Sequence, residues 1–176
     1  MKADDEREFR EFAAARTPSL LRTAYLLSGD WHAAEDVVST ATVKLYTSWR
    51  RVSRADNPAA YARQVVVRTW LDERRRPWRR EHVTDVMPEA TGPQADPATD
   101  EVARRADLRR LLAQLPVRQR AVLVLRFYDD LSIERTAEIL GCSSGAVRSL
   151  TMRALATLRS RLPAGVTTLA ELEEAP

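Results

Sequence analysis

Four side chains in the C-terminal third of the chain have the chemistry and the spacing to contact a nucleic acid. They are Arg148, Ser149, Met152 and Arg153, which share one side of a helix if this stretch is helical. Guanidinium groups bind phosphates and the edge of guanine through paired hydrogen bonds, and a hydroxyl group can bond to either. These residues predict a helix that binds nucleic acid through its outer face.

The flanking residues predict the elements that would position this face. Ser132 can cap a short helix, because its hydroxyl accepts from backbone N–H groups that lack partners in the first turn. Gly141 can end that helix in a left-handed conformation, and Ser143 can cap a second, longer helix. The predicted buried residues recur at helical spacing: Ile133, Ala137 and Leu140 in the first helix, and Val147, Thr151, Ala154, Leu155 and Leu158 in the second.

Two interpretations of residues 131–161 are open at this point. A short capped helix, a glycine-containing turn and a helix with an Arg/Ser outer face are typical of a helix-turn-helix. An ordinary αα-hairpin with a solvated basic face fits the same pattern.

A second basic cluster follows a predicted helix near the middle of the chain. Arg74, Arg75, Arg76, Arg79 and Arg80 surround Pro77 and Trp78. Cations can bind the phosphates of a nucleic-acid strand while an aromatic ring stacks on a base. The alternative is a solvated helix end, whose positive charge complements the helix dipole. Trp70 continues the apolar stripe and is predicted to be core.

The N-terminal third predicts three helices with clear start signals. Apolar residues recur at helical spacing up to Leu27. Within this stretch, Thr17 and Pro18 predict that a new helix begins, with Thr17 as its cap and Pro18 in its first turn. Asp30 can cap a helix that runs to about Trp49, and residues 50–56 read as a polar loop. Asn57 and Pro58 form the cap and first position of the next helix. Glu35 and Asp36 lie in the first two turns of their helix, where negative charge suits the dipole.

Composition and motifs argue against several classes of protein, including disulfide-bonded proteins, cysteine-based zinc proteins and membrane-spanning proteins. The 176 residues carry a formal net charge of +3, and Lys occurs only at positions 2 and 44, so the positive charge is almost all on Arg. Cys142 is the only cysteine, which leaves no disulfide or cysteine-based zinc site, and neither His32 nor His82 belongs to a cluster of metal ligands. No catalytic motif, membrane-spanning run or leader is recognisable. We expect a cytoplasmic protein that is not an enzyme and needs no cofactor or metal.

The chain predicts an all-α fold with two small helical domains. Residues 82–100 contain three prolines, a glycine and scattered acids without periodicity, as expected for a flexible linker. Helical spacing returns from Glu101 to Leu115, and Pro116 opens a further helix through Tyr128. Residues 163–176 read as an acidic tail.

Three blocks of this sequence resemble a known family in the same order and at the same separation. They are LSGDWHAAEDVVSTATVKLYTSW, NPAAYARQVVVRTWLDERRRPWRRE and LPVRQRAVLVLRFYDDLSIERTAEILGCSSGAVRS. They resemble bacterial RNA polymerase sigma factors of the extracytoplasmic-function (ECF) class, and in particular the actinobacterial SigE family. The resemblance implies a region 2-like domain in residues 1–81 and a region 4-like helix-turn-helix domain in residues 101–162.

The resemblance implies an alternative sigma factor that binds core RNA polymerase and directs it to promoter DNA. In the family, the helix that holds Glu35 and Asp36 docks on the clamp helices of the largest polymerase subunit. Ser39 stands where Gln is common and Thr40 where an acid is common. The flap of the second-largest subunit and an anti-sigma factor are the other implied protein partners, and no membrane insertion is implied.

The resemblance also divides the DNA contacts between the two domains. Region 2 would capture the melted −10 strand, with a base flipped into a pocket beside the 50–56 loop. The −10 residues implied are Arg54, Asn57, Arg63, Arg68, Arg74, Arg75 and Arg76, and Asn is common where Arg68 stands. Region 4 would read the −35 duplex through Arg148, Ser149, Met152 and Arg153. Leu150 replaces a common Arg, and Arg135 replaces a common Glu, so no capping box forms there.

Two other functions remain in competition at this stage. A conventional helix-turn-helix regulator would bind a palindromic operator as a dimer, without polymerase. A helical adaptor with incidental arginine enrichment would have no DNA role. A steep salt dependence of DNA binding argues against the adaptor, because neutralised phosphates release counterions.

Overall fold

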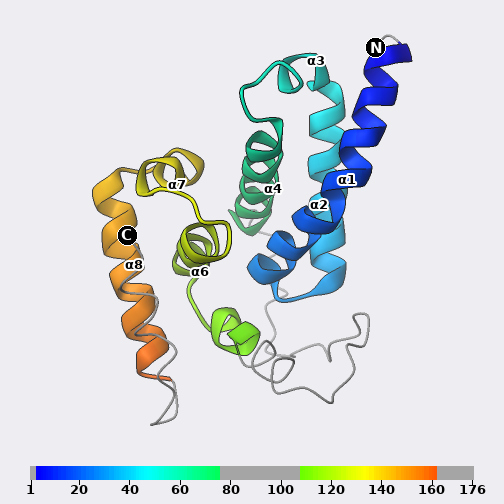
Figure 1. Ribbon diagram of the computed structural model, residues 1–176. Helices are drawn as coiled ribbons and strands as arrows, with labels where there is room; N and C mark the ends of the chain where they lie inside the picture. The colour runs from blue at the N-terminus through cyan, green and yellow to red at the C-terminus, as the bar shows by residue number, and fades with distance from the viewer. Residues whose placement is uncertain (1–2, 76–107, 162–176) are drawn as a thin grey trace. The chain divides into compact units, whose positions relative to one another are not determined.

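The computed structural model describes residues 3–75 and 108–161. The chain divides into two compact units, Met1–Gln94 and Ala95–Pro176. Every regular element in the described residues is a helix (Figure 1), which confirms the all-α prediction. The predicted linker at residues 82–100 and the tail at 163–176 lie outside the described residues.

The first unit is built from α1 (Ala3–Ser28), α2 (Trp31–Thr47), the short α3 (Trp49–Val52) and α4 (Pro58–Arg75). The three long helices pack against one another (Figure 1). Their apolar stripes meet in one core: Phe9, Leu20, Ala24, Leu27, Ala34, Val37, Val38, Ala41, Leu45, Trp49, Val52, Ala62, Val66, Val67 and Trp70 are all buried. The core assignment of Trp70 is confirmed, since only 2% of its surface is exposed.

The predicted helix start at Thr17 and Pro18 is wrong, because α1 continues through both residues. Pro18 has no N–H to donate to the preceding turn, which normally costs about 3 kcal/mol in a helix interior. Thr17 does not cap; its Oγ1 instead donates to the Ala13 carbonyl at 2.7 Å. Phe9 on one side of Pro18 and Leu20 on the other are buried on the same side of the helix. Burial of that continuous stripe outweighs the local cost.

At the joint between α1 and α2, the predicted cap at Asp30 is confirmed. Gly29 adopts φ 78°, a conformation that is inexpensive without a Cβ atom, and ends α1. Asp30 then caps α2, with its Oδ1 accepting from the Ala33 N–H at 2.7 Å. At the other end of α2, the Trp49 ring packs against Phe9 and Phe12 at centroid distances of 5.3 and 4.9 Å.

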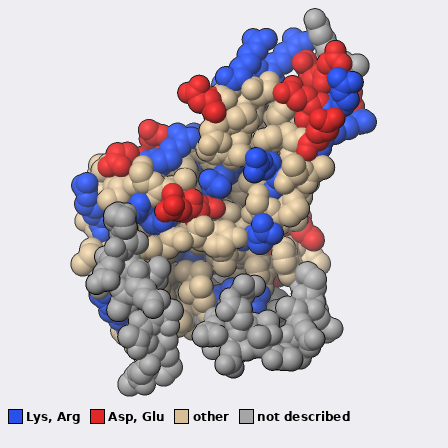
Figure 2. All heavy atoms as spheres, in the orientation of Figure 1, with Lys and Arg blue, Asp and Glu red and all other residues tan. Residues whose placement is uncertain are grey.

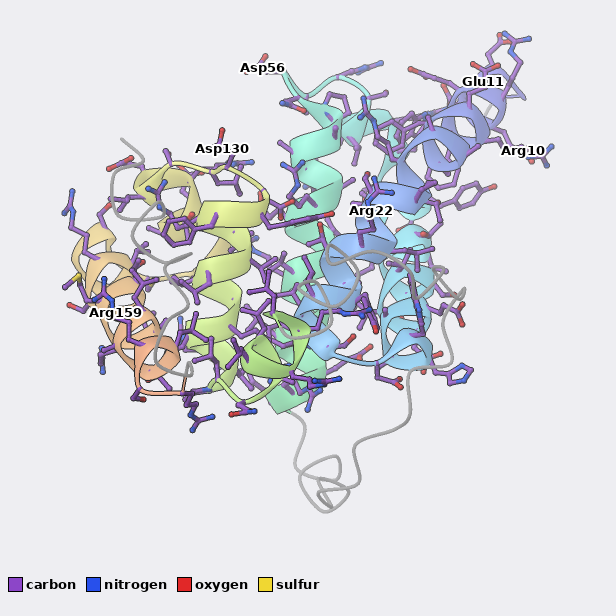
Figure 3. The ribbon with its side chains drawn as sticks, turned by 60° about the horizontal axis from the view of Figure 1, so that its bottom comes forward. Arg10, Glu11, Arg22, Asp56, Asp130 and Arg159 are labelled. Atoms are coloured by element: carbon purple, nitrogen blue, oxygen red, sulfur yellow. The ribbon has the colours of Figure 1, made fainter. Side chains whose placement is uncertain are left out.

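The polar loop predicted for residues 50–56 is partly helical. Arg50 and Arg51 belong to α3, which is anchored by the buried residues Trp49 and Val52. The alternation of buried and exposed residues over a single turn is too short to be recognised as a helix from the sequence. The loop proper is residues 53–57, and its Asp56 projects away from the helices (Figure 3).

The second unit begins with a helical segment at residues 108–113 and continues with α6 (Val117–Leu123), the π-helical turn η2 (Val124–Tyr128), α7 (Ile133–Leu140) and α8 (Ser144–Arg159). Residues 121–125 are all buried and form the centre of this unit. The guanidinium of the buried Arg120 donates to the Ala113 and Leu115 carbonyls at 2.7 and 3.3 Å. These bonds hold the 108–113 helix against α6.

The three predicted caps of the helix-turn-helix are confirmed. The Ser132 hydroxyl accepts from the Arg135 N–H at 3.1 Å, and the Ser143 hydroxyl accepts from the Ala146 N–H at 3.2 Å. Gly141 ends α7 at φ 61°. These local interactions determine where α7 ends and where α8 begins.

No helix within residues 3–75 and 108–161 has both the length and the apolar character needed to cross a bilayer.

Candidate nucleic-acid and protein interfaces

The four residues predicted to contact duplex DNA lie together on the outer side of α8. Arg148, Ser149, Met152 and Arg153 are all exposed, and we call this set the α8 face. The side chain of Met152 is 62% exposed. Arg153 Nε donates to the Ser149 carbonyl at 3.2 Å, which directs the stem of the arginine back along the helix.

The inner side of α8 is fixed by burial against α6 and α7. Val147, Ala154, Leu155 and Leu158 are buried, whereas Thr151 is half-buried. Arg118 of α6 donates to the carbonyl of Leu140 at 2.8 Å and so ties the end of α7 to α6. The half-buried Cys142 donates its backbone N–H to the Ala137 carbonyl at 3.0 Å. The α8 face is therefore presented by a helix with a fixed orientation within this unit.

The residues predicted to bind a single strand are spread along α4. This helix spans 18 residues and is therefore about 27 Å long. Asn57 caps its first turn, with Oδ1 accepting from the Ala60 N–H at 2.9 Å, and Arg54 is exposed in the loop just before it. Arg74 and Arg75 are in the last turn. A nucleic-acid strand that contacts both groups has to follow the length of the helix.

The arginines of α4 occupy two sides of the helix. Arg68 and Arg75 are seven residues apart, both exposed, and lie opposite the buried stripe. Arg63 and Arg74 are eleven residues apart and half-buried along one flank of that stripe. Arg76 lies outside the described residues.

The structure adds Arg51 and Tyr61 to the loop end of α4. An Arg51 guanidinium nitrogen donates to the Tyr61 hydroxyl at 2.6 Å, and its Cζ lies 5.8 Å from the centre of the ring. The side chain of Tyr61 is half-buried. Sequence reasoning missed this pair because Arg51 belongs to a short helix that was predicted as loop.

The four residues predicted to contact protein lie together on the outer side of α2. Glu35, Asp36, Ser39 and Thr40 are exposed, opposite the buried residues Ala34, Val37, Val38, Ala41 and Leu45. His32 Nδ1 lies 3.8 Å from Glu35 Oε2 at the edge of this surface, and the pair is ionic only when the histidine is protonated.

Val43 also belongs to this surface, although the sequence pattern did not lead us to predict it. It is 61% exposed and follows Asp36 by seven residues, so it shares the outer side of α2. The sequence could have identified it, because Val43 does not share the helical spacing of the buried residues of α2. We call Glu35, Asp36, Ser39, Thr40 and Val43 the α2 face.

Charged side chains of both signs are visible on the face of the described residues that Figure 2 shows. Acidic side chains gather at the N-terminal end of α1, where Asp4, Asp5 and Glu6 form the first turn. Arg50 Nε donates to Asp5 there at 3.0 Å. In the part of the chain that the structure describes, no three His, Cys, Asp or Glu side chains are placed to hold a metal ion.

Two family models match most of the chain. The model for Sigma-70 region 2 matches residues 12–80, and the model for Sigma-70, region 4 matches residues 105–158. The first therefore contains α2 and α4, and the second contains α8.

Characterised relatives match over nearly the same span. The chain is 37% identical over 155 residues to an RNA polymerase sigma-E factor of Streptomyces avermitilis, covering 88% of this chain and 85% of the relative. It is 38% identical over 157 residues to the protein of that name in Streptomyces coelicolor, covering 89% and 87%.

A solved structure shares the fold. The sigma factor RpoE of Bartonella quintana, solved in complex with the anti-sigma factor NepR, superposes with a TM-score of 0.69 and 23% identity. The match covers 88% of this chain and 96% of that one.

Proposed function

The chain belongs to the sigma-70 family as an alternative RNA polymerase sigma factor, and from this premise we propose which of its surfaces performs each step of initiation. The α8 face reads the −35 duplex, α4 and the loop before it hold the melted −10 strand, and the α2 face docks on core polymerase. The observation that carries this proposal is that the α8 face and the α2 face each lie exposed opposite a buried stripe, while the described −10 residues lie along α4 and in the loop before it.

The chemistry of the α8 face suits the major groove. Arg148 can donate two hydrogen bonds to the O6 and N7 atoms of guanine, a contact that discriminates by roughly 1–3 kcal/mol. Arg153 can add a phosphate contact, which positions the helix without reading sequence. The caps at Ser132 and Ser143 fix the helix before DNA arrives, so binding does not have to order it.

The length of α4 suits a single strand whose bases are unstacked. Arg68 and Arg75 face outward two turns apart and can bind successive phosphates of one backbone. Arg54 and the Arg51–Tyr61 pair lie at the other end, where a base extruded from the duplex can stack and form hydrogen bonds. These contacts offset the cost of unpairing.

The α2 face combines carboxylates with an exposed apolar residue. Glu35 and Asp36 suit a basic partner, and Val43 provides an apolar centre among polar neighbours. Interfaces between proteins commonly have such an apolar core with a polar rim. We propose the clamp helices of the largest polymerase subunit as the partner of this face, and the flap of the second-largest subunit as a partner of the second unit.

Three finer points also belong to this proposal. We place the protein in the cytoplasm with its polymerase. We assign it no catalytic activity of its own, because the family consists of transcription initiation factors. We also propose that an anti-sigma factor regulates it, as the complex of RpoE with NepR suggests.

Run-off transcription tests the proposal. The purified chain is added to sigma-free core polymerase on a library of genomic promoter fragments, with core polymerase alone as the control. Specific transcripts that appear only in the mixture are expected. Failure of the chain to associate with core polymerase in a pull-down would overturn the proposal.

A further inference from the structure

Met152 is the most exposed large apolar side chain in residues 3–75 and 108–161. It belongs to the α8 face, where the other three members are polar or charged. Within the described residues Met152 does not contribute to the core of its unit, which is built from the opposite side of α8.

Met152 also belongs to a row of exposed residues that runs along the outer side of α8. Gly145, Ser149, Met152 and Ala156 are separated by four, three and four residues, so they form one row, and all four are exposed. Met152 is the only long side chain in that row. Small neighbours on both sides allow the helix backbone to approach a surface closely while Met152 reaches farther than the rest of the row.

The two arginines of the α8 face lie on either side of this row. Arg148 lies on the preceding turn toward one edge, and Arg153 lies toward the other, with Nε held by the Ser149 carbonyl. Phosphate contacts position a recognition helix and base-edge contacts read the sequence, and Met152 is the side chain that lies between the two arginines on the turn that follows Arg148. The group that reaches the bases at this level is therefore a thioether with a terminal methyl group.

The only apolar group on a base edge in the major groove is the C5 methyl of thymine. We propose that Met152 determines specificity at one base pair of the −35 element by packing its thioether end against a thymine methyl group. This inference rests on the proposed function, in which α8 reads the −35 duplex. A thioether offers no useful partner to the N4 amino group of cytosine, so a C·G pair at this position is disfavoured.

Deoxyuridine substitution tests the contact directly, because it removes the methyl group and leaves every hydrogen-bonding group of the base in place. Holoenzyme made from the full chain and core polymerase is bound to a promoter mapped by run-off transcription. Each thymine of the −35 element, on either strand, is replaced in turn by deoxyuridine. Wild type should lose about fourfold in affinity at one position, the change expected for one buried methyl-sized group.

Variants of Met152 test whether its side chain is responsible for that loss of affinity. Met152→Ala and Met152→Gln should bind the thymine and deoxyuridine duplexes equally at that position, whereas Met152→Leu should keep the preference for thymine. A cytosine at the same position should regain affinity for wild type when it is replaced by 5-methylcytosine.

Three outcomes overturn the inference. They are a −35 element with no methyl-sensitive thymine, a Met152→Ala protein that keeps the full deoxyuridine effect, and a Met152→Gln protein that keeps it. If the holoenzyme binds the promoter normally in those experiments, only the role of Met152 fails. If the chain gives no promoter binding with core polymerase, the proposed function fails as well.

Discussion

Lys44 on α2 donates a hydrogen bond from Nζ to Oγ1 of Thr69 on α4 at 2.9 Å. Thr69 is buried, with 1% of its surface exposed, while the stem of Lys44 reaches it from the surface. The bond joins the helix proposed to dock on polymerase to the helix proposed to hold the −10 strand. It fixes the position of one helix relative to the other at the level of Trp70 in the core.

Loss of this bond should destabilise the first unit. Lys44→Met keeps most of the aliphatic stem but leaves Thr69 Oγ1 without this donor, and we expect the free energy of unfolding to fall by about 1 kcal/mol. All four tryptophans of the chain precede residue 79, so tryptophan fluorescence in urea follows this unit alone in the intact protein.

The matched control is Arg7→Ala, which removes an exposed pair with Asp4 on α1. Exposed pairs of this kind contribute little, so its urea midpoint should stay within error of wild type. An unchanged midpoint for Lys44→Met would contradict the structural role of the Lys44–Thr69 bond.

Two glycines near the turn of the helix-turn-helix should respond in opposite directions to alanine. Gly141 has φ +61°, so Gly141→Ala should destabilise the second unit by about 1–2 kcal/mol. Gly145 is helical, and a Cβ there would meet only Ser143 Oγ at 3.9 Å, so Gly145→Ala should stabilise it by up to about 1 kcal/mol. Native-state hydrogen exchange of the α8 amides in the intact chain measures both. Changes of the same sign would contradict the assigned backbone conformations.

Much of the helix framework could be predicted because its signals are local. Asp30, Asn57, Ser132, Gly141 and Ser143 each act on backbone groups within a few residues, and all five behave as expected. Pro18 was misjudged because the burial that carries α1 through it involves residues on other helices. The π-helical turn at 124–128 was not foreseen, since nothing in its composition separates it from an α-helix.

The candidate sites were predictable to a similar degree. Arg148 was placed on an outer helix face from spacing alone, and it is exposed. Val43 was missed because an apolar residue in a helix is usually assigned to the core. The Arg51–Tyr61 pair was missed because Arg51 lies in a helical turn too short to be recognised in the sequence.

Single substitutions should affect DNA recognition and polymerase docking separately. Arg148→Ala should lower the affinity of the holoenzyme for −35 duplex by about tenfold or more while leaving core polymerase affinity unchanged. Asp36→Arg should weaken core polymerase binding and leave the −35 contact of any holoenzyme that forms intact. Fluorescence anisotropy with labelled duplex and with labelled core polymerase measures the two affinities. Equal effects of either change on both affinities, with the fold preserved, would show that this division is wrong.

Val43→Asp should weaken core polymerase binding by about tenfold or more. The change places a charge in the apolar centre of the α2 face, where it loses water on docking. The free chain should keep its stability, because Val43 is 61% exposed. Ala14→Asp, at an exposed position of α1, is the matched control and should bind normally. Normal polymerase affinity of Val43→Asp would remove Val43 from the docking surface.

Footprinting of one promoter fragment tests whether the chain acts together with core polymerase through two separate DNA contacts. The chain alone, core polymerase alone and the mixture are compared, with permanganate used to detect unpaired thymines. Only the mixture should protect two separate elements, with unpaired thymines confined to the downstream one. Protection of a palindrome by a dimer of the chain alone, with no unpaired thymines when polymerase is added, would instead identify a conventional helix-turn-helix regulator.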